Sequence, residues 1–109
     1  MKSMKSTSSG SSNLSGQLSF RHTETVTDAT SEALSVPAMD RETLIVVQPG
    51  TSATVQYTLS SAEAIEADTA IWIDWPAGSV TEQTSDAISG AITALRLVSV
   101  GVSTWEVAK

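Results

Sequence analysis

The 109-residue chain contains no cysteine, only one histidine, and six glycines that are all isolated from one another. Without cysteine there can be no disulfide, thiolate metal site or cysteine nucleophile, and this composition is compatible with a reducing cytoplasm. Isolated glycines argue against a glycine-rich phosphate-binding loop. No apolar run approaches the roughly 18 residues of a membrane-spanning helix, so no membrane partner is expected. Lys2 and Lys5 are followed by serine and glycine instead of an apolar stretch, so no secretory signal is expected.

Charge is divided unevenly along the chain. Residues 1–23 contain three basic side chains and no acidic one, which gives +3. Residues 24–109 contain all twelve acids and only three basic residues, Arg41, Arg96 and Lys109, which gives −9. Because phosphate contact needs a cationic surface, no nucleic-acid partner is expected. The basic segment is either suited to an acidic neighbour or is a solvated tail with incidental lysines.

Residues 1–16 are predicted to form an extended Ser/Gly-rich basic arm, and residues 17–109 a single domain. Eight of the first nineteen residues are serine, and the sizeable apolar side chains are Met1, Met4, Leu14 and Leu18. Such a segment cannot bury enough apolar surface to offset an ordering cost of about 1–2 kcal/mol per residue. If it is ordered, contact with another molecule must hold it. Lys2, Lys5, Leu14 and Leu18 are therefore candidate interface residues of a larger assembly.

The domain itself is rich in valine, isoleucine, threonine and alanine, with turn residues at short intervals, a pattern that favours short strands. Strands are predicted at 17–24, 32–36, 43–47, 53–59, 70–75, 80–84, 92–100 and 103–108, with a loop at 85–90. Residues 60–67 predict one helical turn, with Ser60 or Ser61 as its N-cap. The predicted fold class is all-β, as a small antiparallel β-sandwich or barrel with one short helical turn and an N-terminal arm.

Two hairpins are expected from these runs. The segments 43–47 and 53–59 flank Pro49-Gly50, a pair that suits a type II turn. The segments 92–100 and 103–108 are expected to pair around Gly101, with Leu95 and Leu97 opposite Trp105 and Val107. The triplet Pro76-Ala77-Gly78 is expected to end the strand at 70–75.

Residues that could support catalysis are few. His22 is the only histidine, and no serine lies in a Gly-x-Ser-x-Gly setting. Glu63 and Glu66 are interpreted as a solvated helical face, not as an acid–base pair. The acids between residues 68 and 86 match no EF-hand spacing. We therefore expect a protein that is not an enzyme, with no catalytic, metal or cofactor site.

Two tryptophans and one arginine are further interface candidates. Trp72 and Trp75 are three residues apart, which places them on opposite faces of a strand. One of them should be buried, and the other should lie at an edge, under a loop or against another chain, where aromatic anchors are favoured. Stacking on a sugar, or a bulge that turns both inward, are the alternatives. Arg96 lies within an apolar strand and is expected to emerge at an edge, to pair with Asp74 or Glu106, or to form an ion pair between subunits.

Two runs of sequence resemble small virion-associated proteins of tailed bacteriophages. The first is AIWIDWPAGSVT at residues 70–81. The second is GAITALRL at residues 90–97, followed by a glycine turn and the terminal strand Thr104-Trp105-Glu106-Val107. Ala91 stands where those proteins have proline. The resemblance covers residues 53–108, does not include the arm, and carries over no catalytic residue.

The resemblance implies a structural virion component, made in the cytoplasm of a bacterial host and located on the capsid exterior. The most suitable role is a capsid decoration or cement protein that binds the major capsid protein or other virion subunits. Its arm would add main-chain hydrogen bonds to a neighbour's sheet edge. A homo-oligomer, with a trimer on a local threefold axis, would suit such a role. The alternatives are a tail, collar or fibre-attachment component, or a receptor- or carbohydrate-binding module that uses Trp72 or Trp75.

Overall fold

The computed structural model describes residues 20–109, so the predicted arm and its candidates Lys2, Lys5, Leu14 and Leu18 lie outside the described residues. Eight strands and one short helix follow in order: β1 (Arg21–Thr27), β2 (Leu34–Ser35), β3 (Thr43–Gln48), β4 (Ser52–Thr58), α1 (Ala62–Glu66), β5 (Ile73–Val80), β6 (Thr84–Ile88), β7 (Ala94–Val100) and β8 (Val102–Ala108). The all-β prediction and the single helical turn are confirmed.

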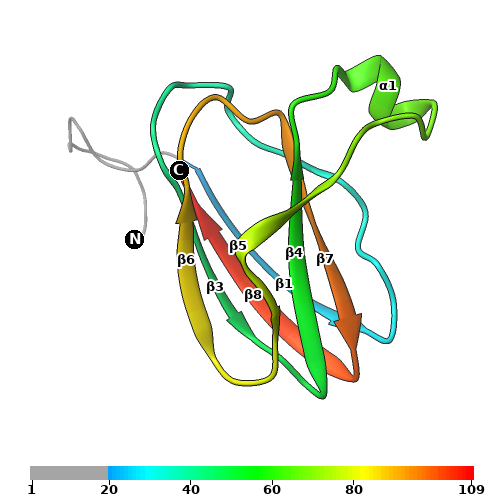
Figure 1. The fold of residues 1–109 in the computed structure, drawn as a ribbon, viewed down its shortest axis with the longest axis vertical. Coiled ribbons are helices and arrows are strands. Elements are labelled where there is room, and N and C mark those ends of the chain that lie inside the picture. Colours follow the sequence, from blue (N-terminus) through cyan, green and yellow to red (C-terminus); the bar gives the residue numbers. More distant parts are fainter. Residues whose placement is uncertain (1–19) are drawn as a thin grey trace, which may run out of the picture.

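The strands form two antiparallel sheets of four that pack face to face (Figure 1). Sheet A has the order β1-β8-β3-β6, and sheet B has the order β2-β7-β4-β5. Strands that follow one another in sequence fall in opposite sheets, except β4 and β5, which pair around α1. This order is that of an eight-stranded jelly roll, in which two interlocked Greek keys build one sandwich.

Both predicted hairpins are wrong, because each connection crosses between the sheets. β3 belongs to sheet A and β4 to sheet B, while β7 belongs to sheet B and β8 to sheet A. Leu97 therefore pairs with Val55 within sheet B, and Trp105 pairs with Val47 within sheet A. The apolar residues expected to meet along a ladder instead face each other across the sandwich interior.

Glycines make these two crossings possible where they pack together at one end of the sandwich. A Cβ added at Gly50 would lie 2.7 Å from Val102 O, and one added at Gly101 would lie 2.8 Å from Thr51 N. Gly101 also adopts a φ of 81°, whereas Gly50 is not in the left-handed region, so the predicted type II turn is wrong. A glycine is needed at position 50 because the backbone of Val102 lies too close for a Cβ, and not because of the turn geometry.

A buried hydroxyl network secures the same end of the sandwich. Ser99 Oγ lies 2.9 Å from Val26 O and 2.8 Å from Ser103 Oγ, which also accepts the Gly50 N–H at 3.0 Å. The Asp28 carboxylate accepts the Gly101 N–H at 2.7 Å. These bonds join β1, both crossings and β7, and they satisfy polar groups that would be costly to bury alone.

The core between the sheets is built from the inward-facing residues of each strand. Alternation of buried and exposed residues is clearest in β8, where Ser103, Trp105 and Val107 are buried and the residues between them are more accessible. The buried apolar residues are Val26, Val36, Ile45, Val47, Ala53, Val55, Trp75, Val80, Ile88, Ile92, Ala94, Leu95, Leu97, Trp105 and Val107. Such alternation is what a half-buried strand requires.

The expectation that Pro76-Ala77-Gly78 ends a strand is wrong, because β5 continues through these residues as a bulge. The register between β4 and β5 changes from Thr54 opposite Ser79 to Gln56 opposite Asp74. The Trp75 indole N–H donates to Gly78 O at 2.6 Å, which closes the bulge. Extra residues in one strand are accommodated in this way without breaking the sheet.

The predicted loop at 85–90 is also wrong, since β6 occupies most of it.

The helical turn forms where it was predicted, and its local cause is clear. Ser61 Oγ accepts the Ala64 N–H at 3.2 Å, and Glu63 lies in the first turn, where its charge suits the helix dipole. Within residues 20–109 no helix is long and apolar enough to cross a membrane.

Candidate interaction surfaces

The two tryptophans of the AIWIDW run have different environments. Trp75 is 2 % exposed and packs in the core, so the proposed interface or sugar-stacking role is wrong for this residue. Trp72 is half-buried and lies just before β5, against Arg96. The prediction that one ring is buried and the other is not is therefore confirmed.

Arg96 lies at one end of a polar ladder on the outer face of sheet B, with Gln56 at its centre. Its Nε–H donates to Gln56 Oε1 at 2.8 Å, and Gln56 Nε2 donates to Asp74 Oδ1 at 2.9 Å. The ladder forms because Gln56 lies opposite Arg96 on β7 and opposite Asp74 on β5. Within residues 20–109, Arg96 therefore does not pair directly with Asp74 or Glu106, as one alternative predicted, and is connected to Asp74 only through the Gln56 amide.

Trp72 completes this site, which we call the Arg96 ladder (Trp72, Arg96, Gln56 and Asp74). The Arg96 guanidinium carbon lies 4.3 Å from the centre of the Trp72 ring. A guanidinium over an indole is attracted by the negative face of the ring. The stack and the Gln56 hydrogen bond together fix the orientation of the Arg96 side chain.

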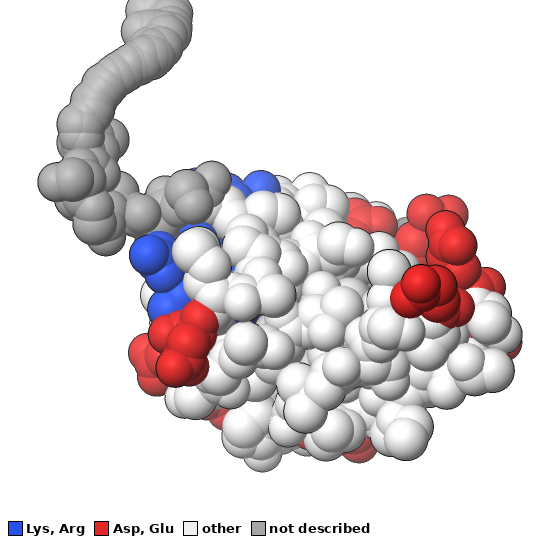
Figure 2. Space-filling model, turned by 90° about the horizontal axis from the view of Figure 1, so that it is seen from above, with Lys and Arg blue, Asp and Glu red and all other residues white. Residues whose placement is uncertain are grey.

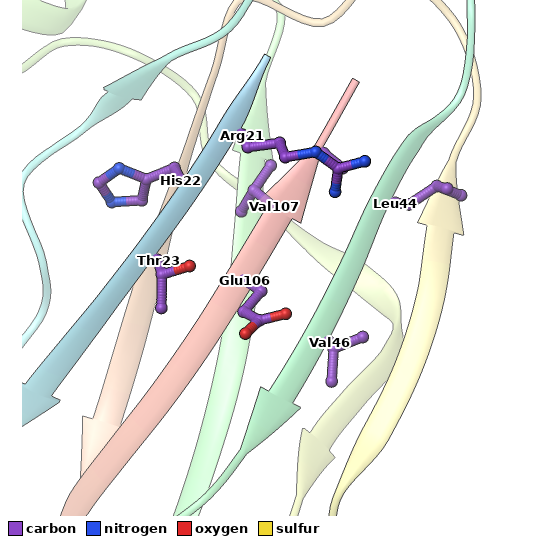
Figure 3. A pocket seen from close by; sticks show the side chains of 8 residues that line it. Arg21, His22, Thr23, Leu44, Val46, Glu106 and Val107 are labelled. Carbon is purple, nitrogen blue, oxygen red and sulfur yellow. The ribbon is translucent and has the colours of Figure 1, made fainter. Parts of the chain in front are cut away.

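A second surface is the outer face of sheet A, which carries a shallow hollow of about 370 Å³ over β8. The hollow forms because Ala108 lies between Arg21 on β1 and Leu44 on β3, and this small side chain leaves space between longer neighbours. Glu106 lies further along β8, between Thr23 and Val46. Figure 3 shows the Arg21 side chain crossing above β8, with the His22 ring on the other side of β1.

The hollow continues along β8 instead of closing into a pocket. A neighbouring depression is lined by Val46, Gln48, Gln83, Thr104 and Glu106. Together they form an open trough parallel to the central strand. An enclosed apolar pocket is what small-molecule ligands usually require, so this shape is better suited to a protein segment.

At the end of the domain that carries α1, the basic side chains gather on one side with an acidic group beside them, and further acidic side chains gather on the opposite side (Figure 2). Basic groups lie near the start of β1, where Lys109 pairs with Phe20 through backbone hydrogen bonds of 3.0 and 3.1 Å. Acidic groups lie at the α1 side, which carries Glu63, Glu66 and Asp68. The α1 side therefore favours a basic partner, whereas the opposite side carries both signs of charge.

Lys109 is the buried cation of the basic side. Burial lowers the pKa of its ammonium, Arg41 lowers it further, and Asp40 opposes this change. The pKa of Lys109 is lower in the folded than in the unfolded state, so burial of the charged ammonium lowers the free energy of unfolding at pH values below the folded-state pKa. The free energy of unfolding rises as pH increases through this lowered pKa, because the ammonium then loses its proton. The Lys109 Nζ has Gly90 O at 3.4 Å, a weak partner for a charged group.

His22 belongs to a cluster with Glu24 and Trp105. Its Nε2 lies 3.1 Å from Glu24 Oε1, which also accepts the Trp105 indole N–H at 3.2 Å. The His22 ring meets the Trp105 ring edge to face at 6.1 Å. The described part of the chain contains no group of three or more metal-ligating side chains.

Gln56, Leu44, Val46 and Ala108 were not identified as site residues from the sequence. Gln56 becomes important only through the register that places it between Arg96 and Asp74. The hollow depends on three neighbouring strands that are far apart in sequence. Neither arrangement leaves a local signal in the chain.

No family model matches this chain, and no curated protein or solved structure shows significant similarity to it.

Proposed function

We propose that this protein is a structural component of a virion, namely a capsid decoration or cement protein that bridges neighbouring capsid subunits. The observation that carries the proposal is the presence of two candidate interaction surfaces on opposite faces of one small sandwich. The trough lies on sheet A, and the Arg96 ladder lies on sheet B. A domain must contact two neighbours to bridge them, and opposite faces satisfy this requirement.

The fold and the charge distribution support the same role. Jelly rolls of eight strands recur in viral capsid and lectin domains, although a fold alone does not assign a function. The basic N-terminal segment enters the domain at Phe20, which pairs with Lys109 at the end of sheet A nearest the hollow. From there the segment is suited to reach a neighbouring subunit, and a trimer on a local threefold axis would repeat this contact symmetrically.

The proposed mechanism is mechanical. Each copy adds a contact between two subunits, which raises the free energy needed to separate them. Contacts repeated over a lattice act together, so weak individual contacts give a large combined effect.

Particles that lack this protein are expected to assemble but to break at a lower temperature and under milder osmotic shock than complete particles. The physical reason is the loss of bridging contacts without loss of the capsid subunits themselves. Release of the genome on heating, measured by dye accessibility, tests this expectation. Adding purified protein back should restore the original breakage temperature, whereas equal stability with and without the protein would contradict a cementing role.

A further inference from the structure

Strand β1 forms an open edge of sheet A. Within residues 20–109, β1 lies at the end of the strand order and pairs with β8 alone. Phe20 and Lys109 exchange two backbone hydrogen bonds of 3.0 and 3.1 Å, and residues of an antiparallel strand bond alternately to one side and to the other. The N–H and C=O groups that point away from β8 are therefore those of Arg21, Thr23, Thr25 and Thr27, whose side chains are all exposed.

The other edges of the described sandwich carry features that hinder pairing with a further strand. β5 contains Pro76 within its bulge, and β2 is only two residues long. On β6, the Ala87 N–H is already bonded to Asp86 Oδ1 at 2.8 Å. β1 pairs with β8 over seven consecutive residues and contains no proline, glycine or bulge. Because exposed sheet edges are usually protected in this way, the open edge of β1 favours pairing with another strand.

The backbone of β1 can pair with a second copy of itself about a twofold axis at Thr23. In this antiparallel register Thr23 lies opposite Thr23 of the second copy, and Arg21 lies opposite its Thr25. These are residues whose backbone groups point outward, so each opposed pair can exchange two hydrogen bonds. A twofold contact of this kind uses the same surface on both copies and closes on itself.

The side chains of β1 are complementary in the same register. His22 lies opposite Glu24 of the second copy, in a non-hydrogen-bonded position where opposed Cβ atoms are about 4.5–5.5 Å apart. The contact within one copy uses His22 Nε2 and Glu24 Oε1, whereas His22 Nδ1 and Glu24 Oε2 have no hydrogen-bond partner within residues 20–109. These two atoms suit a hydrogen bond between copies, which the twofold axis forms twice.

Shifted registers are less favourable. A shift by two residues in one direction places Glu24 opposite Glu24 of the second copy, and like charges directly opposite are destabilising. The same shift in the other direction places His22 opposite His22 and leaves Glu24 opposite Phe20. A further shift would require pairing at Asp28, where a φ of 47° ends the extended backbone. The charges of β1 therefore favour one register, in which the complementary strand is β1 itself.

We propose that two copies of this protein associate through the open edge of β1, so that their A sheets join into one sheet of eight strands. The joined order is β6-β3-β8-β1 followed by β1-β8-β3-β6 of the second copy. This twofold contact is separate from the threefold contact proposed for the N-terminal segments. It concerns the association of free copies and does not rest on the proposed virion function.

Sedimentation equilibrium of the full chain tests the association. The mass is expected to double as concentration rises, with a micromolar dissociation constant, since a single strand pair is a small interface. Backbone amide exchange measured by NMR should slow for Thr23 and Thr25 as the dimer forms, but not for Ser85 on β6. An isotope-filtered NOE between the Hα atoms of His22 and Glu24 should identify the register, because these residues are about 7 Å apart along one strand.

Thr23→Pro removes an outward N–H at the twofold axis without removing a bond to β8, and it should weaken the dimer at least about tenfold. Ser85→Pro is the matched control, because the Ser85 N–H points outward from the opposite edge of sheet A, and it should leave the dimer unchanged. Glu24→Gln keeps an oxygen for the Trp105 indole N–H but removes the charge, and it should weaken the dimer about fivefold. Tryptophan fluorescence checks folding, and Glu24→Gln tests the contact if Thr23→Pro does not fold.

A monomer at millimolar concentration would overturn the proposal, as would dimers of folded Thr23→Pro or of Glu24→Gln as stable as those of the unchanged chain. Slow exchange of the Thr23 and Thr25 amides in the monomer would show that the same chain covers the edge. Loss of the dimer after deletion of residues 1–16 would assign the contact to the N-terminal segment in place of β1. Either of these results would also overturn the proposal.

Discussion

Replacing Gly50 with alanine is expected to lower the free energy of unfolding by about 3 kcal/mol, a large part of the stability of a small domain. The added Cβ would lie 2.7 Å from Val102 O and would also clash with Val102 N. Both contacts are with backbone, so no flexible side chain can move aside. The clash would separate the two crossings between sheets and weaken the Gly50 N–H to Ser103 Oγ hydrogen bond.

Urea denaturation followed by tryptophan fluorescence measures this loss, because Trp75 and Trp105 are buried in the native state. Gly90→Ala is the matched control. Gly90 has a φ of 99°, but a Cβ there would meet no atom within 4 Å, so only backbone strain of about 1 kcal/mol is expected. If Gly50→Ala unfolds at the same urea concentration as Gly90→Ala, the packing of the two crossings is not what stabilises this end of the sandwich.

Deleting residues 1–16 is expected to leave a folded domain that binds its particle at least about tenfold more weakly, a loss of about 1.4 kcal/mol or more per contact. The domain should fold because β1 begins at Arg21 and Phe20 retains its pairing with Lys109. Binding should fall because the deletion removes Lys2 and Lys5 together with the chain proposed to reach a neighbour. Co-sedimentation of labelled protein with particles that lack it measures the change.

A double variant, Lys2→Gln with Lys5→Gln, separates charge from chain length. The double variant should weaken binding less than the deletion does. The difference in affinity between the double variant and the full chain should shrink at high salt, because salt screens the lysine charges, over about 10 Å at ordinary ionic strength. Equal thermal unfolding of the truncated and full chains is required for a clean interpretation. Binding of the truncated chain as tightly as the full chain would remove the N-terminal segment from the proposed mechanism.

Local patterns in the sequence predicted most of the strands but not their partners. The strand expected at 80–84 is wrong, because residues 81–83 form the turn between β5 and β6. The strand β4 and the cap of α1 by Ser61 each depend on residues close together in the chain, and both predictions are confirmed. Alternation shows which face of a strand is buried, but a strand in the opposite sheet satisfies that pattern as well as a neighbour in the same sheet. For this reason the sequence suggested hairpins at Gly50 and Gly101 where the chain crosses between sheets.

The Arg96 ladder illustrates the same limit at the level of a site. The spacing of Trp72 and Trp75 predicted that they face opposite sides, and the apolar surroundings of Arg96 identified it as unusual. The role of Gln56 could not be predicted, because it depends on the register of β4 with both β5 and β7. The bulge after Trp75 alters that register, and its closing hydrogen bond to Gly78 O has no sequence signature.

The central claim is that this jelly-roll domain bridges capsid subunits, and a reconstruction of the native particle by electron cryomicroscopy tests it most directly. The account predicts density for the sandwich in hundreds of copies on the outer shell, with the outer faces of sheets A and B against different neighbours. Density confined to a tail or collar, or a domain that contacts a single neighbour through one face, would contradict it.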